Sequence, residues 1–551
     1  MNKSKIMCLC AILLALVLSA CAGDTGAGGA AGGEAGGAGA AGAAAPAQDT
    51  AEVFDFMFVD EPLTLTAFID FDQRAATTIT SYNEQYAFIE LANLTGITID
   101  FIHPPAGQTD ERFNLMVASG DLTDIIWRNW IAYPGGPVRA IADGVIIDIR
   151  HYKENYAPNK MDLILNHHYV DSRDLFTDYG QMFHFTFFRL DYLLRHTEGF
   201  YIRSDWLDTL GLNVPVSLCE WENVLRAMRD HGPFNDAPYV LPFFGQGIGA
   251  IHRFIPAHGI RRDFYMCPRD NVIKFGAVQP EYRDHVELMQ RWFQEGLIDP
   301  EIMVTDGAGF FAKATSHLGG AFSGWLGGNM STFLGLMQDD PDYALVGAGW
   351  PSLYPGGTRW NPSTIAHRAA EPSGFGISAT NQHVRESVQF LDFLYSEEGH
   401  YLINFGPEGV AWDMVDGVPT FRDYIMNHPE LSPIQAMTRY GQNTIWFSYI
   451  QDPHGFFQAL RFPGTREAAE ENSRSDKSLS LPWLTPTYEE GMRVATIMGD
   501  IWSFVNESYA SWIVGGDSLD NWDDYVAELE RLGINEVVAI QEAALARFNA
   551  R

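Results

Sequence analysis

The run Trp127-Arg128-Asn129-Trp130 directly follows a predicted buried strand that starts at Asp124. An indole ring stacks on a flat apolar face, while guanidinium and amide groups bond in pairs to neighbouring hydroxyls. This combination suits a polar ring compound such as a sugar, which has apolar ring faces and hydroxyl edges. Because alternate side chains of a strand point to opposite faces, we expect one tryptophan to face a solute. Packing of the whole run at a sheet end remains an open alternative.

Asp72 stands at the end of another predicted strand, residues 63–71. Its carboxylate is a bidentate acceptor for two neighbouring hydroxyls. A helix N-cap or a solvated loop is an equally good interpretation, since aspartate is common in both.

The elements around these residues alternate. Predicted strands at 63–71, 97–103 and from 124 onward are separated by predicted helices at 82–95 and 110–118. Strands separated by helices indicate a parallel sheet with both faces covered, hence an α/β protein. In such sheets a ligand binds beyond the carboxyl ends of the strands, which is where Asp72 and the tryptophan run are placed. A body of about 500 residues also exceeds one core and predicts two or more lobes.

Motifs of known catalytic or metal sites do not occur. The chain has no Gly-x-Ser-x-Gly, Walker, His-Glu-x-x-His or Cys-x-x-Cys motif, and His167-His168 are adjacent rather than one helical turn apart. Asp70 and Asp72 lack the residues that complete a calcium loop. We therefore expect a protein that is not an enzyme and needs no metal or cofactor. A glycoside hydrolase remains a less favoured alternative, because two of the many carboxylates are enough for that chemistry.

The N-terminus has the pattern of a secretion signal. Lys3 and Lys5 precede an apolar stretch at 6–18, and Leu-Ser-Ala-Cys ending at Cys21 resembles a bacterial lipoprotein cleavage site. This pattern predicts a lipoprotein signal peptide at 1–20 and a lipid on Cys21. Residues 21–51 are mostly Gly and Ala, a composition typical of a flexible tether. An ordinary secretory signal or an uncleaved anchor is the alternative.

Acidic residues dominate the charge of the chain. There are 70 Asp and Glu against 36 Lys and Arg, a net charge of −34. Such a surface repels nucleic acid and anionic lipid, so we expect no nucleic-acid partner and membrane contact only through the lipid.

Two cysteines remain in the mature body, Cys219 and Cys267, and either one disulfide or two thiols fits them.

Segments across the body resemble family 1 extracellular solute-binding proteins. The first, FNLMVASGDLTDI, has Thr123 where proline is usual in the family. The segments in chain order are residues 113–125, 201–212, 292–301, 390–410 and 522–543. Members with these segments are the larger lipoproteins of Gram-positive bacteria, which are associated with uptake of complex carbohydrates.

This resemblance implies a two-lobe periplasmic-binding-protein-like fold of type II, hinged by segments that cross between the lobes. Lobe one would comprise residues 52–195 and 377–445, and lobe two residues 196–376 and 446–551. The resemblance also makes Trp325, which follows a predicted buried strand, the strongest stacking candidate. Phe244 and Trp412 are weaker candidates, because most large aromatic side chains belong to a core.

The function implied by the resemblance is that of an extracellular substrate-binding lipoprotein of an ABC transporter. It would capture a carbohydrate, or another polar small solute, by hinge closure and deliver it to the transmembrane permease subunits. We expect a monomer, anchored by its lipid at the outer face of the cytoplasmic membrane. A ligand sensor for a chemoreceptor or kinase remains open, because it would use the same closure.

Overall fold

The computed structural model describes residues 57–551. The predicted signal peptide, Cys21 and the whole predicted tether at 21–51 therefore lie outside the described residues. The larger sheet, here called sheet one, has the order β2-β1-β3-β11-β4. β1, β2 and β3 pair in parallel, whereas β11 runs antiparallel to both of its neighbours. Its strands are β1 (Leu63–Phe68), β2 (Ile97–Ile102), β3 (Ile125–Asn129), β4 (Phe185–Phe188) and β11 (Ala370–Ile377).

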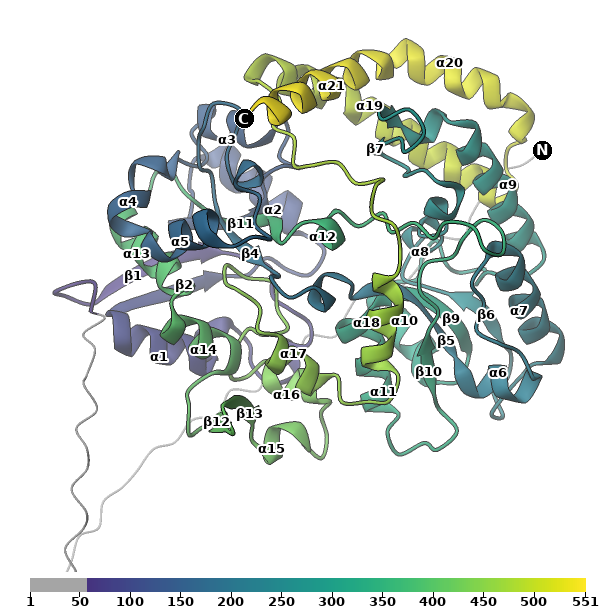
Figure 1. Ribbon diagram of the computed structural model, residues 1–551, viewed down its shortest axis with the longest axis horizontal. Helices are drawn as coiled ribbons and strands as arrows, with labels where there is room; N and C mark the ends of the chain where they lie inside the picture. Colours follow the sequence, from purple (N-terminus) through teal and green to yellow (C-terminus); the bar gives the residue numbers. More distant parts are fainter. Residues whose placement is uncertain (1–56) are drawn as a thin grey trace, which may run out of the picture. The chain divides into compact units, whose positions relative to one another are not determined.

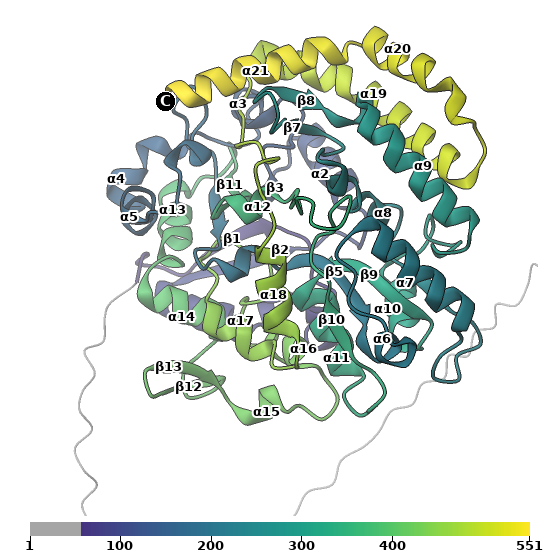
Figure 2. The same cartoon turned by 45° about the vertical axis from the view of Figure 1, so that its right-hand side comes forward.

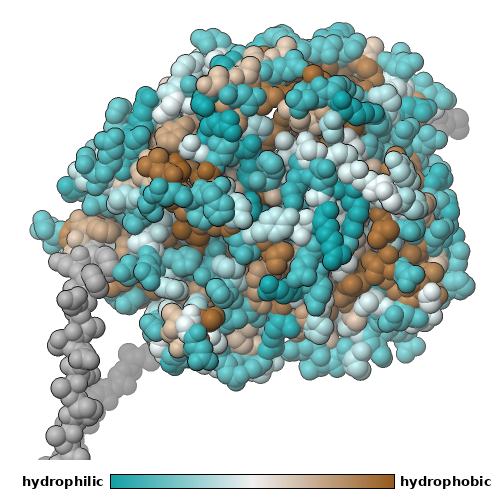
Figure 3. All heavy atoms as spheres, viewed as in Figure 1, coloured by the Kyte–Doolittle hydropathy of each residue, from teal (hydrophilic) through white to brown (hydrophobic). Residues whose placement is uncertain are grey.

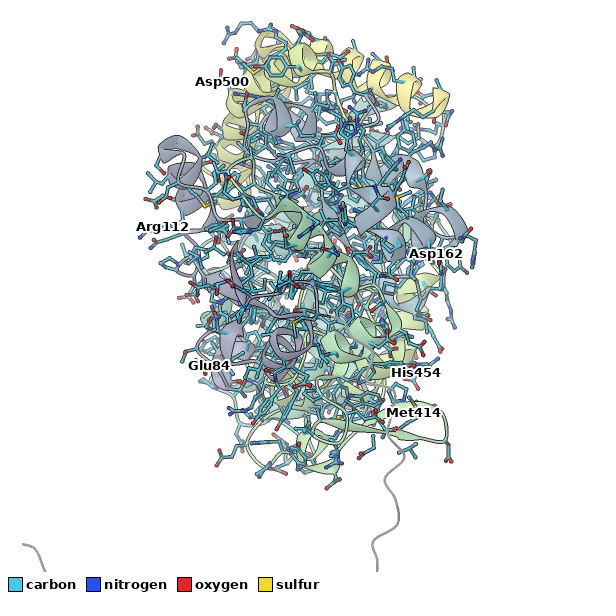
Figure 4. All side chains as sticks on the ribbon, turned by 90° about the vertical axis from the view of Figure 1, so that its left-hand side faces the viewer. Glu84, Arg112, Asp162, Met414, His454 and Asp500 are labelled. Carbon is cyan, nitrogen blue, oxygen red and sulfur yellow. The ribbon has the colours of Figure 1, made fainter. Side chains whose placement is uncertain are left out.

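Helices cover both faces of sheet one. Buried side chains of α1, α5 and α13 share one core cluster, and those of α2 and α3 belong to another. Figure 4 shows Arg112 of α2 and Asp162 of α5 on opposite sides of this half of the molecule. The helices are α1 (Tyr86–Thr95), α2 (Thr109–Ser119), α3 (Gly136–Ala142), α4 (Lys153–Tyr156), α5 (Pro158–Asn166), α13 (Val384–Phe393) and α14 (Glu397–Phe405).

Local sequence explains these elements. In β2, reading ITIDFI, apolar residues alternate with exposed ones, which is the pattern of a strand with one buried face. The preceding helix α1 ends at Thr95 and is followed by the capping residue Gly96, which has φ of +74°. Glycine adopts this left-handed conformation without steric cost, so the chain can turn directly from helix into strand.

The second sheet, here called sheet two, has the order β10-β5-β9-β6. β6 and β9 are parallel, and β5 runs antiparallel to β9 and β10. Its strands are β5 (Glu198–Arg203), β6 (Leu241–Phe244), β9 (Gly319–Trp325) and β10 (Leu345–Gly347). Helices around it are α6 (Ser204–Leu210), α7 (Leu218–His231), α8 (Gly249–His252), α9 (Pro280–Gln294), α10 (Gly307–Thr315) and α11 (Thr332–Leu336).

The chain passes between the two sheets more than once. It leaves sheet one after β4, forms β5 of sheet two, and returns to sheet one at β11. This arrangement confirms the predicted two-lobe α/β fold with crossing segments (Figure 1). The numerical lobe boundaries stay a prediction, because one hydrophobic cluster takes Phe322 and Phe333 from predicted lobe two and Phe405 and Phe421 from predicted lobe one.

Smaller elements complete the fold. Two short hairpins, β7-β8 and β12-β13, stand apart from the two larger sheets. The elements are β7 (Phe264–Met266), β8 (Ile273–Phe275), β12 (Trp412–Val415), β13 (Val418–Phe421), α12 (Thr364–His367), α15 (Asp423–Met426), α16 (Pro433–Met437), α17 (Pro453–Ala459) and α18 (Thr465–Ser473). Polar side chains cover most of the face shown in Figure 3, with scattered apolar patches.

Residues 488–551, here called the C-terminal strap, form α19 (Tyr488–Val514), α20 (Trp522–Leu532) and α21 (Ile534–Ala550). α19 contacts both α9 beside sheet two and α3 beside sheet one. Figures 1 and 2 both show α21 running from α20 toward the part of the molecule that holds α3. The strap therefore spans the two halves.

The structure also shows the state of the two cysteines and the character of the helices. Cys219 is exposed and Cys267 is buried, and both are free thiols rather than one disulfide. Among the helices of residues 57–551, none has the length and apolar character needed to cross a bilayer.

Candidate functional site

A pocket of about 140 Å³, here called the interlobe pocket, lies between sheet one and sheet two. Side chains and backbone from both halves line it. The lining residues are Arg74, Phe187, Arg189, Thr197, Trp325, Gly327, Gly328, Asn329, Thr444, Ile445, Trp446, Gln451 and Phe456. A cavity of about this size holds one benzene-sized ring, so the pocket admits a single ring in this conformation.

The strand topology brings these residues together. Arg189 directly follows β4 and Trp325 is the last residue of β9, so each lies at the carboxyl end of its strand. The antiparallel strand β5 starts opposite, with Glu198 paired to Trp325, and this places the preceding Thr197 at the same edge. The pocket thus occupies the position where α/β sheets bind ligands.

Two tryptophans form a right-angled corner of the pocket. The ring centroids of Trp325 and Trp446 are 5.9 Å apart and their planes are 84° apart. Both side chains are partly exposed, so each presents a ring surface to the pocket. The backbone N–H of Trp325 donates to Asn329 Oδ1 at 2.7 Å, which fixes the chain where β9 turns into the π-helical turn Leu326–Ser331. Such turns occur frequently at functional sites.

Arg74 reaches the pocket with Asp72 behind it. Arg74 Nε donates to Asp72 Oδ1 at 2.8 Å, and Arg74 Nη2 donates to the carbonyl of Thr444 at 2.8 Å. Burial alone would raise the pKa of Asp72, but the Arg74 guanidinium holds it below the usual value. Asp72 therefore carries a negative charge that orients Arg74, and Arg74 is the member of the pair that lines the pocket.

Arg189 is buried among aromatic rings. Its guanidinium carbon lies 5.0 Å from the ring centroid of Trp446, 5.2 Å from that of Phe187 and 5.9 Å from that of Trp325. The nearest carboxylate belongs to Glu371, with Nη1 and Oε1 3.7 Å apart, which is beyond hydrogen-bond distance. Burial raises the pKa of Glu371 to about 7, although Arg189 opposes this rise.

Comparison with known proteins shows what the chain is similar to. No family model matches it. It is 22% identical to the fructooligosaccharide ABC transporter substrate-binding protein FusA of Streptococcus pneumoniae serotype 4 over 502 residues, 85% of this chain and 88% of FusA. It is 23% identical to lipoprotein LipO of Bacillus subtilis strain 168 over 346 residues, 60% of this chain and 64% of LipO.

Solved structures agree with these relatives. The alginate-binding protein AlgQ2 superposes with a TM-score of 0.74 at 23% identity, covering 89% of this chain and 99% of AlgQ2. FusA in complex with kestose gives 0.71 at 20% identity, covering 88% of this chain and 99% of FusA. The chain has the two-lobe solute-binding-protein fold. The predicted resemblance to extracellular solute-binding proteins is thereby confirmed in fold and in relatives.

Within this solute-binding fold, the run after β3 does not line the interlobe pocket. Trp127 packs against Phe375 and Phe447, with ring centroids 5.4 and 6.2 Å away. Trp130 is fully buried and its Nε1 donates to the carbonyl of Gly374 at 3.0 Å. The two tryptophans belong to different core clusters, as the strand alternation requires, and both serve packing in this structure.

The polar members of that run also point elsewhere. Arg128 pairs with Asp110 and its guanidinium carbon lies 4.6 Å from the ring centroid of Phe113. Asn129 is exposed and its Oδ1 accepts from the backbone N–H of Ala132 at 3.1 Å. Neither residue lines the interlobe pocket.

The remaining candidates lie either at the pocket or in a core. Trp325 lines the pocket, and Asp72 contacts it indirectly by bonding to the lining residue Arg74. Phe244 is 1% exposed in a hydrophobic core, where it packs against Phe310 and Phe322. Trp412 is 4% exposed and its Nε1 donates to the carbonyl of Gly406 at 2.8 Å. Neither Phe244 nor Trp412 lines the pocket.

Sequence reasoning missed Arg74, Arg189 and Trp446. Arg189 follows Phe-Thr-Phe-Phe, a wholly buried strand, so an arginine directly after an apolar run was the available signal. Arg74 stands two residues after Asp72, which was considered only for its own carboxylate. Trp446 lies in an irregular segment that reaches the pocket only through tertiary packing.

Proposed function

We propose that this protein captures a carbohydrate in the interlobe pocket and delivers it to the permease of an ABC importer. The observation that carries this proposal is the pocket itself, where Trp325 and Trp446 offer ring surfaces beside two guanidinium groups. Aromatic planes bind the C–H faces of a sugar, and planar donors bind its hydroxyls. The names of FusA and AlgQ2, a fructooligosaccharide-binding and an alginate-binding protein, support a saccharide.

Binding would use hinge closure. A solute first contacts one lobe, and the other lobe then closes and completes the site, so the solute shifts an equilibrium between open and closed states. Because the pocket admits about one ring in this conformation, a longer saccharide requires a more open state or an extension of the site along the cleft.

The same proposal places the protein outside the cell. A lipid on Cys21 would hold it at the outer face of the cytoplasmic membrane, and the Gly and Ala-rich tether at 21–51 would let the lobes reach the permease. The proposed role requires binding and release without chemistry on the solute. Transport energy would come from ATP hydrolysed by the transporter.

Thermal-shift screening of the purified protein against oligosaccharides tests this function. A saccharide at a hundredfold excess over its Kd stabilises the folded protein by about 2.7 kcal/mol. Isothermal titration of each hit supplies the Kd, and chromatography of the recovered saccharide checks that it is intact. Failure of every saccharide to bind, or cleavage of those that bind, would contradict the proposal.

A further inference from the structure

The charged residues lining the interlobe pocket are both cationic. Arg74 and Arg189 line it, and none of the lining residues is Asp or Glu. This is unexpected in a chain with 70 acidic and 36 basic residues. The pocket therefore has a local charge pattern opposite to that of the whole sequence.

Arg74 is positioned to present a free edge across the pocket. Its Nε and Nη2 are bonded to Asp72 and Thr444 on the sheet-one side. Its Nη1 lies 4.0 Å from the position that a Cβ on Gly328 would take, and Gly328 belongs to the turn after β9 of sheet two. The Asp72 carboxylate neutralises the charge of Arg74, but it leaves this Nη1 edge directed at the opposite wall.

The guanidinium group of Arg189 has fewer hydrogen-bond partners than that of Arg74. The residue is 5% exposed, and its Nε and Nη1 have no hydrogen-bond partner among the described residues. The aromatic rings around it attract the guanidinium charge, but they do not accept its N–H groups as a carboxylate or carbonyl does. Unpaired donors of a buried cation are costly. Because both nitrogens are buried in this conformation, an acceptor from outside the chain would reach them when the lobes open.

Glu371 does not supply that acceptor. Its carboxylate is 3.7 Å from Arg189, and both of its oxygens also lack hydrogen-bond partners. Because burial keeps Glu371 partly protonated near neutral pH, it cancels only part of the charge on Arg189. A neutral hydroxyl would accept one N–H without balancing the remaining charge, whereas a carboxylate accepts two N–H groups in the planar geometry of a guanidinium.

We infer that the solute is an acidic saccharide, whose uronic-acid carboxylate is bound by Arg189 and approached by Nη1 of Arg74. This inference rests on the proposed function and narrows its substrate class. The uronic-acid ring would stack in the corner formed by Trp325 and Trp446. The acidic outer surface opposes binding only weakly, because exposed charges are screened beyond about 8 Å at physiological salt.

Paired saccharides test the inference. Isothermal titration compares short oligosaccharides of galacturonic, mannuronic and glucuronic acid with their carboxyl-reduced counterparts of equal length and linkage. We expect at least one acidic series to bind, and its reduced counterpart to bind about 10- to 100-fold more weakly, as loss of a charge-assisted bidentate contact predicts. Equal or tighter binding of the reduced saccharide would overturn the inference.

Substitutions of Arg189 test whether this residue binds the carboxylate of the saccharide. Arg189→Gln should weaken the acidic saccharide about 10- to 100-fold while changing binding of the reduced one much less, and Arg189→Lys should lie between. The double variant Arg189→Gln with Glu371→Gln removes both charges and guards against misfolding from an isolated carboxyl group. Arg128→Gln is the matched control, since Arg128 also has a carboxylate partner and an aromatic contact but lies outside the pocket.

The outcomes separate the two proposals. If neutral oligosaccharides bind and uronates do not, the inference is wrong and the proposed function stands. If Arg189→Gln weakens binding of acidic and reduced saccharides equally, Arg189 does not recognise a carboxylate and the inference is also wrong. If neither class binds, the proposed function fails together with the inference.

Discussion

The interlobe pocket and the C-terminal strap differ in how their charged groups are satisfied. Beside the pocket, Arg189 and the neighbouring Glu371 of sheet one lie 3.7 Å apart without a hydrogen bond. At the strap, Arg547 Nε donates to Asp178 at 2.6 Å and its Nη1 donates to Glu490 at 3.0 Å, while Arg551 lies 3.2 Å from Asp178. The charged groups of the strap are thus satisfied within the chain, whereas Nε and Nη1 of Arg189 have no partner among the described residues. We therefore expect the strap to hold the lobes together while the pocket admits the solute.

The largest expected effects on stability and on binding come from replacing one tryptophan in the strap and one in the pocket. Trp512 in the strap is 1% exposed, so Trp512→Ala should lower the free energy of unfolding by about 3–5 kcal/mol. Trp325 in the pocket is partly exposed, so Trp325→Ala should cost little stability but weaken solute binding by about 2 kcal/mol, roughly 30-fold. Urea unfolding and isothermal titration on both variants measure the two quantities. Similar profiles for the two variants would remove the distinction.

Asp178 tests the strap itself. Its side chain is 5% exposed and accepts from Arg547 while pairing with Arg551. Asp178→Ala leaves both arginines without this partner and should lower the free energy of unfolding by about 2–4 kcal/mol. Glu528→Ala is the control, because its partner Arg531 is largely exposed, and should change stability by less than about 0.5 kcal/mol. Urea unfolding that gives equal losses for the two variants would contradict the assigned role of the strap.

Glu371 gives the pocket side a pH dependence. Its pKa is raised from 4.5 to about 7 by burial, against the influence of Arg189, while His184 packs nearby with its Nε2 3.4 Å from the Glu371 carbonyl. The folded state holds this proton more tightly than the unfolded state. Stability from Glu371 is therefore present below about pH 4.5 and lost as pH rises through about 7.

Glu371→Gln should remove this component. Between pH 4.5 and 7 the free energy of unfolding of the parent should fall by about 1–2 kcal/mol more than that of the variant. Urea unfolding across this range measures the difference, and other titrating groups cancel because both proteins contain them. Parallel curves would show that Glu371 is ionised in the folded state throughout.

The smallest effect is expected outside both regions. Arg128→Ala and Asn129→Ala change residues that the sequence placed in the binding site and the structure places away from the pocket. Solute affinity by isothermal titration should change less than about twofold, because neither residue lines the pocket. A loss comparable to that of Trp325→Ala would move the binding site toward the end of β3.

The sequence predicted much of the architecture because local patterns determine it. The alternation in β2 and the left-handed Gly96 after α1 mark a strand and a helix end without reference to the rest of the chain. Trp325 could also be predicted from the sequence, since it ends a buried strand at the edge where α/β proteins bind ligands. The family resemblance supplied the two-lobe arrangement.

The rest of the site depends on contacts that local patterns do not encode. Arg189, Trp325 and Trp446 come from three distant segments and meet only when both sheets are assembled. Trp130 was one of two tryptophans of which one was expected to face a solute, yet its indole donates to the carbonyl of Gly374 in β11, a strand contributed by the returning chain. Packing between distant segments thus decided which aromatic side chains remained available.

A crystal structure of the protein grown with its tightest-binding saccharide tests the central claim most directly. We predict that a sugar ring lies in the corner of Trp325 and Trp446 with an acceptor on Arg189. A saccharide bound instead in the groove of about 590 Å³ lined by residues 131–136 and α19 of the strap would contradict the account.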